Sequence, residues 1–100
     1  MLFRSVTVIA EAVLESRLID DLRNLGARGY MVSSVRGESW RGVRTAEWSE
    51  PHIRLETFVD EALAERIARL LAQEYLPFYA MMVYQEPMVV ARSDRKPRPE

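Results

Sequence analysis

The stretch HIRLETFVDEALAERIARLLAQEYL, residues 52–76, contains a strand and a helix joined by one capping residue. From Ile53 to Val59, apolar or β-branched side chains alternate with polar or bulky ones, which is the period of a strand with two different faces. Asp60 is a favoured helix N-cap, and leucine and isoleucine then recur at helical spacing until Pro77 ends the helix. The stretch therefore predicts one strand–helix unit.

Two further strands and a helix are predicted before this unit. Residues 2–10 are rich in β-branched side chains, residues 13–25 carry leucines at helical spacing before a glycine, and residues 30–36 form a second short apolar run. After the unit, residues 79–86 predict a fourth strand. We expect Pro87 to break this strand, and residues 88–90 to resume briefly as an edge or fifth strand.

The predicted order, β-α-β-β-α-β, is that of the ferredoxin-like α+β sandwich. Right-handed crossovers place both helices on one face of an antiparallel sheet, with a long loop between the second and third strands. The first and fourth strands nevertheless carry apolar side chains on both of their faces. A sheet with one face in water would alternate with polar residues there, so we predict that another subunit covers the open face of a homo-oligomer.

Composition narrows the class of protein further. The chain has 100 residues, a net charge of −1 and no cysteine, which argues against nucleic acid as a partner and excludes disulfides and thiolate metal sites. The first residues lack the apolar stretch of a signal peptide, and no uncharged apolar run approaches the roughly 20 residues of a membrane span. We expect a cytoplasmic protein without membrane insertion.

Catalytic and metal-binding signatures are missing from the sequence. His52 is the single histidine, and the sequence offers it no catalytic or metal-ligating partners. Neither a GxxxxGK[ST] phosphate loop nor a GxGxxG turn is present. We therefore expect no enzyme activity, no metal site and no resident cofactor.

The loop predicted between residues 38 and 51 is the distinctive part of the chain. It holds both tryptophans, and arginines surround it at positions 36, 41, 44 and 54, while four more cations lie in the charged tail of residues 92–100. Arginines beside a glycine at a strand end suit an anion, through bidentate hydrogen bonds and free backbone N–H groups. The alternative is that Glu38, Glu47 and Glu50 balance solvated arginines, and that Trp40 and Trp48 pack on their own subunit.

The run GYMVSSVRGES, residues 29–39, resembles the second-strand signature of PII signal-transduction proteins, in which a strand leads into a basic residue, a glycine and the long T-loop. The element order and the basic C-terminal end fit as well. PII proteins also carry a glycine- and lysine-rich B-loop that binds the outer phosphates of ATP, whereas residues 73–84 here read QEYLPFYAMMVY. The loop after Gly37 is short for a T-loop and contains no tyrosine for uridylylation.

These departures make the chain more similar to the PII-like proteins associated with bicarbonate transport and carboxysomes. Such proteins are trimers that bind ADP, AMP or cyclic AMP between subunits, and some respond to bicarbonate. The resemblance implies that Arg36 and Gly37 contact the nucleotide phosphates and that Arg92 is one basic residue of the C-terminal end. The second such basic position falls on Val90, and fewer cations favour ADP or AMP over ATP.

The remaining residues of the implied site follow from the same resemblance. Met31, Val32 and Ser33 match the strand positions that meet the base and ribose in the adjacent subunit, while Ser39 and Arg41 lie at the base of the T-loop. Ligand binding would control the loop, which would present Trp40, Arg44 and Trp48 to a partner such as a membrane transporter for bicarbonate. Residues 1–91 would then form the folded domain.

Two alternatives remain open at the level of sequence. One is an oligomer of the CutA-like type that binds a metal or another small ligand, although the absence of cysteine counts against soft metals. The other is a small enzyme of the ferredoxin-like monooxygenase type, which would need a pocket within one subunit. A PII-like regulator needs a cleft between subunits.

Overall fold

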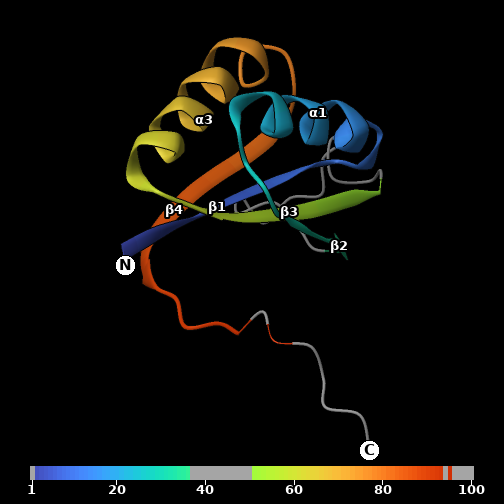
Figure 1. The fold of residues 1–100 in the computed structure, drawn as a ribbon. Helices are drawn as coiled ribbons and strands as arrows, with labels where there is room; N and C mark the ends of the chain where they lie inside the picture. The colour runs from blue at the N-terminus through green and yellow to red at the C-terminus, as the bar shows by residue number, and fades with distance from the viewer. Residues whose placement is uncertain (1, 37–50, 94, 96–100) are drawn as a thin grey trace, which may run out of the picture.

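The computed structural model describes residues 2–36, 51–93 and 95, and confirms the ferredoxin-like order (Figure 1). The elements follow one another as β1 (Leu2–Glu11), a short 3-10 helix η1 (Ala12–Leu14), α1 (Glu15–Leu25), β2 (Met31–Val35), β3 (His52–Val59), α3 (Glu61–Glu74) and β4 (Met81–Val89). The four strands form one antiparallel sheet in the order β2-β3-β1-β4. Both helices lie on the same face of this sheet.

Strand β1 lies in the middle of the sheet and pairs along its length with both β3 and β4. Its C-terminal end lies beside the start of β3 and the start of β4, where Glu11 pairs with His52 and Ala10 with Met81. Val35, at the end of β2, also pairs with His52. The sheet therefore has one rim that joins the ends of β1 and β2 to the starts of β3 and β4, which we call the loop rim.

The core lies between the sheet and the two helices, as the apolar spacing predicts. Val6 and Val8 of β1 are buried, and they pack in one cluster with leucines of α1 and with Ile67 and Leu71 of α3. Burial of such side chains stabilises the fold by about 1.5–3 kcal/mol for each one. The sheet face beneath the helices is thereby closed.

The connection from α1 to β2 is held by two local features. Gly26 has a φ of 109° and donates its N–H to the carbonyls of Leu22 and Arg23, which ends α1 in the left-handed conformation that glycine favours. The hydroxyl of Thr57 on β3 then donates to the carbonyl of Gly29 at 2.6 Å. This bond fixes the chain just before β2 begins.

The face of the sheet opposite the helices carries large apolar side chains that are partly in water. Met31 of β2, Phe58 of β3, and Tyr84 and Met88 of β4 are 37–54% exposed, and the strand registers place them on this face. Between them lie Ser5 and Thr7 of β1, hidden by their larger neighbours. Exposed apolar side chains gathered on one face are typical of a surface that another protein covers.

The expectation that Pro87 breaks the fourth strand is wrong. One continuous strand, β4, runs through Pro87, which pairs with Arg4, and no separate fifth strand forms at residues 88–90. The reason is the position of β4 at the edge of the sheet, because a proline can take part in an edge strand when its missing N–H would have faced outward.

Removing the cap of α3 tests how the strand–helix unit is joined. The side chain of Asp60 accepts the N–H of Leu63 at 2.8 Å, so Asp60→Ala should lower the free energy of unfolding by about 1 kcal/mol. Urea denaturation would measure the change, with Glu65→Ala on the exposed side of the same helix as the control, which should stay within about 0.5 kcal/mol. Equal effects of the two substitutions would contradict the assignment of the cap.

Candidate functional site

Strand β2 is one edge of the sheet and presents the residues that were predicted to meet a base and ribose. The register with β3 places Met31 and Ser33 on the open face, where Met31 is 54% exposed. Val32 points the other way and packs against the core. Met31 and Ser33 can therefore offer side chains to a ligand, whereas Val32 can offer its backbone.

Arg36 directly follows β2 and lies exposed at the loop rim. The N–H of Ala12 donates to the carbonyl of Pro51 at 2.9 Å, which fastens the start of η1 to the residue before β3. The segment between Arg36 and Pro51 thus leaves from and returns to this rim. Six predicted site or partner residues lie outside the described residues: Gly37, Ser39, Trp40, Arg41, Arg44 and Trp48.

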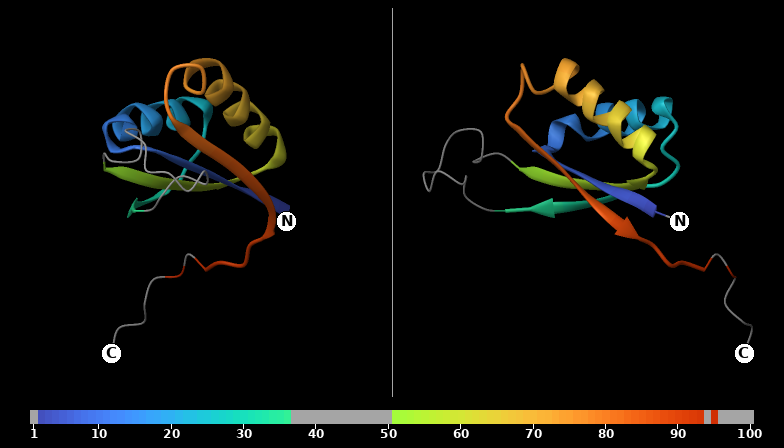
Figure 2. Two further views of the ribbon diagram at one scale, coloured as in Figure 1. Left: turned by 180° about the vertical axis from the view of Figure 1, so that it is seen from behind. Right: turned by 90° about the vertical axis from the view of Figure 1, so that its left-hand side faces the viewer.

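Arg92 lies at the opposite end of the sheet from Arg36. It follows β4, whose last residue, Val89, pairs with Leu2 at the start of β1, and the chain then leads away from the sheet (Figure 2). At about 3.3 Å per residue, the length of β1 separates the two ends of the sheet by roughly 30 Å. One subunit therefore does not bring Arg36 and Arg92 together.

Arg54 was counted among the arginines that surround the loop, but the structure gives it a carboxylate partner. Its Nε lies 3.3 Å from Oε1 of Glu56 on the open face of β3. Ser33 of β2 lies beside Arg54 in the register. The anion hypothesis at this rim therefore depends on Arg36 within the described part of the chain.

The turn between α3 and β4 is clamped to α1 by four side chains that sequence reasoning did not single out. Tyr75 is fully buried, and its hydroxyl donates to a carboxylate oxygen of Asp21. The guanidinium of Arg17 lies 4.6 Å from the centre of the Tyr75 ring and donates to the hydroxyl of Tyr79 at 3.1 Å. Arg17 and Asp21 are one helical turn apart, so α1 holds the turn at two points.

The clamp changes the acidity of Tyr75. Burial, followed by the hydrogen bond to Asp21 and the charge of that carboxylate, raises the pKa of Tyr75 above its ordinary value, while Arg17 opposes the rise. The hydroxyl therefore remains a proton donor throughout the physiological range of pH. Spacing on α1 and the composition of the turn gave no signal for this pairing, because the four residues meet only when α1 packs beside α3.

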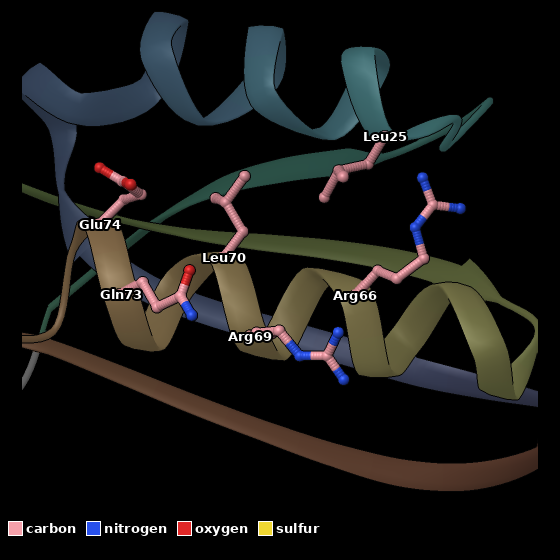
Figure 3. Close-up of a pocket in the computed structure, with 6 residues that line it drawn as sticks. All are labelled: Leu25, Arg66, Arg69, Leu70, Gln73 and Glu74. Atoms are coloured by element: carbon pink, nitrogen blue, oxygen red, sulfur yellow. The ribbon is translucent and has the colours of Figure 1, made fainter.

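An open groove lies between α1 and α3 on the helical side of the molecule (Figure 3). Leu25 of α1 and Leu70 of α3 point into it, and Arg66 extends toward the end of α1. The groove is lined by Leu25, Arg66, Arg69, Leu70, Gln73 and Glu74. None of the predicted nucleotide-contact residues belongs to this set, so the groove is separate from the candidate site at β2.

The described residues contain no clustered metal ligands and no membrane-spanning helix. No group of three or more histidine, cysteine, aspartate or glutamate side chains is arranged there to hold a metal ion. Within residues 2–36, 51–93 and 95, no helix is long and apolar enough to cross a membrane.

A ferredoxin-like sheet with both helices on one face, and with an arginine directly after its edge strand β2, is consistent with the architecture of PII-like proteins. Residues 3–95 match the family model described as nitrogen regulatory protein P-II. The chain belongs to the P-II family of nitrogen regulatory proteins.

Solved structures agree with this membership. A PII-like signalling protein from Thermus thermophilus is 43% identical to the chain, with a TM-score of 0.76 and 88% of each chain covered. The PII-like protein CPII from Thiomonas intermedia is 18% identical, with a TM-score of 0.78, 93% of this chain covered and 97% of that chain. CPII was solved bound to ADP, AMP and bicarbonate, and at this identity the likeness shows the shared fold. A search of curated proteins found no match.

Replacing Tyr75 with Phe tests the clamp through its pH dependence. The ordinary tyrosine pKa is 10.0, and the pKa in the folded protein is higher, so the unfolded chain loses this proton first as the pH rises. The free energy of unfolding of the wild type should therefore fall once the pH passes about 10. Tyr75→Phe should be less stable by about 1 kcal/mol at neutral pH, but should lose less additional stability on the alkaline side.

Urea denaturation at neutral pH and above pH 10 would measure both effects. Tyr30→Phe is a suitable control, because the Tyr30 hydroxyl is exposed and accepts a long hydrogen bond of 3.4 Å from Arg23. If Tyr75→Phe and the wild type lost the same amount of stability above pH 10, the clamp would not raise the pKa of the Tyr75 hydroxyl.

Proposed function

We propose that the protein is a homotrimeric, PII-like regulator that binds an adenine nucleotide in clefts between its subunits. ADP or AMP is the proposed ligand, with bicarbonate as a second one. Membership of a family of nitrogen regulatory proteins supports the regulatory role, and the ligands in the CPII structures support the class of signal. The protein would act as a cytoplasmic sensor and not as an enzyme.

The separation of Arg36 from Arg92 is the observation that carries this proposal. Both arginines are candidates for phosphate contacts, yet they lie at opposite ends of the sheet in one subunit. A second subunit can bring its own Arg92 to the Arg36 of the first. The exposed apolar side chains of the open face supply the surface on which such subunits would associate.

Within the cleft, each part of the site would contact a different part of the nucleotide. Met31 and Ser33 present side chains on the open face of an edge strand, and Val32 presents its backbone, which suits contacts to a base and a ribose. Arg36 would pair with a phosphate through bidentate hydrogen bonds, and Gly37, Ser39 and Arg41 would complete the phosphate side. Arg92 of the neighbouring subunit would add the second cation.

The proposed output is a contact made by the T-loop, residues 38–51. Arg36, which precedes this loop, and Pro51, which ends it, lie at the loop rim, where the proposed phosphates would bind. Ligand could therefore shift the loop between states, provided that it binds one state more tightly than the other. Trp40, Arg44 and Trp48 would meet the partner, for which a membrane transporter of bicarbonate is the proposed example.

Titration calorimetry with AMP, ADP and ATP tests the nucleotide site. Arg36→Ala should weaken AMP and ADP binding by about 10- to 100-fold, which is the size of a lost charge-assisted hydrogen bond. Arg69→Ala removes an exposed arginine from α3, away from β2, and should leave the affinity unchanged. Size-exclusion chromatography should give the same oligomer for both variants. Unchanged affinity in Arg36→Ala would remove the proposed site.

A further inference from the structure

Three side chains of α3 form one ridge along the groove between α1 and α3. Arg66, Leu70 and Glu74 are spaced by four residues, which places them in a row on the same side of the helix. Figure 3 shows Leu70 between the other two, and Leu25 of α1 points into the groove from the other side. The ridge therefore has a cation at one end, an apolar side chain in the middle and a carboxylate at the other end.

Neither charge of this ridge has an ionic partner among the described residues. Arg66 and Glu74 are both exposed, and the helix separates them by about 12 Å along its axis, which is too far for an ion pair. Within residues 2–36, 51–93 and 95, ion pairs join Arg4 to Glu61 and Arg54 to Glu56. Both ends of the ridge therefore present a charge that a partner of opposite sign could meet.

The size of the groove favours a protein partner over a small molecule. Its volume is about 230 Å³, whereas pockets that bury drug-sized ligands measure about 300–1,000 Å³. An apolar centre with charges around it is the usual arrangement of a contact between proteins. The groove therefore suits a few side chains of another protein surface.

The opposite charges at the two ends restrict what that surface can be. An acidic segment would attract Arg66 but repel Glu74, and a basic segment such as the tail of residues 92–100 would do the reverse. The matching surface carries a carboxylate, an apolar side chain and a cation in the opposite order. A second copy of the same ridge, turned to run antiparallel, has this order.

A twofold axis at Leu70 would match the two ridges at every position. Arg66 and Glu74 are each four residues from Leu70, so each arginine would lie opposite the glutamate of the other copy. The two Leu70 side chains would meet at the axis, each beside Leu25 of the other copy. This contact would contain two identical ion pairs around an apolar centre.

We infer that Arg66, Leu70 and Glu74 form a self-complementary surface through which two molecules of this protein associate by their helical faces. The surface lies on the opposite side of the sheet from the open face, so it stays accessible in the proposed trimer. None of the predicted nucleotide-contact residues lines the groove, and the inference does not depend on that site. Exposed ion pairs contribute little each, so the association should be weak and should increase with concentration.

Sedimentation velocity over protein concentrations from about 10 μM to about 1 mM tests the inference. The average mass of the wild type should rise with concentration beyond that of the proposed trimer. Arg66→Glu and Glu74→Arg should each weaken this association by about tenfold, because each places like charges at both ends of the contact. Arg28→Glu and Glu65→Arg make the same changes of charge at exposed positions that do not line the groove, and should leave the association unchanged.

Mixing the two variants makes the measurement decisive. A contact between one Arg66→Glu molecule and one Glu74→Arg molecule has opposite charges at both ends, so the mixture should associate although neither variant does so alone. The double variant Arg66→Glu with Glu74→Arg should recover to within about twofold of the wild type. Both results require the two charges to meet between molecules, which a general effect of net charge would not reproduce.

Three results would overturn the inference: a wild-type mass that does not change over the whole range, single variants that associate as well as the wild type, or a mixture that associates no better than its components. Each of them would leave the ridge to a partner of another kind. The proposed function fails or stands separately, because AMP or ADP binding should be the same in the wild type and in all of these variants.

Discussion

The double pairing of β1 is the constraint on which the rest of the structure depends. Because β3 and β4 flank it on both sides, β1 forms the middle of the sheet, and the two crossover helices must share one face. The other face keeps exposed apolar side chains, which the proposed neighbouring subunits would cover. Together with the pairing of β2 and β3, it fixes which strand ends lie together, because it brings the ends of β1 and β2 to the starts of β3 and β4 at one rim.

This geometry separates the two candidate phosphate-binding arginines within one subunit. The candidate phosphate arginine after β2 lies at the loop rim, and the arginine after β4 lies at the far end of the sheet. The proposed ligand site would thus have one half at each end of the fold. A cyclic arrangement of identical subunits brings such halves together, because each contact joins one end of a subunit to the other end of its neighbour.

The sequence was sufficient for most of the fold and for less of the site. Alternation at residues 53–59 and leucine spacing on both helices predicted the elements, because burial on one face imposes those periods. Pro87 misled the prediction, since whether proline ends a strand depends on whether that strand is at an edge. Arg54 was assigned to the anion-binding rim, although its pairing with Glu56 depends on how side chains lie on β3.

The clamp between α1 and the α3–β4 turn was beyond sequence reasoning for a similar reason. Arg17 and Asp21 look like ordinary polar residues of a helix, and Tyr75 and Tyr79 look like ordinary aromatic residues near a proline. Their structural role follows from the packing of α1 beside α3, which buries one tyrosine and places an arginine against both rings.

Mixed oligomers of two variants would decide whether the site is shared between subunits. Arg36→Ala and Arg92→Ala would each be assembled alone and also together, and AMP or ADP binding would be measured by titration calorimetry. Each variant alone should bind weakly. In randomly mixed oligomers, about one quarter of the interfaces join an intact Arg36 to an intact Arg92, so about that fraction of sites should regain wild-type affinity. Mixed oligomers with no tight sites would contradict a site built from two subunits.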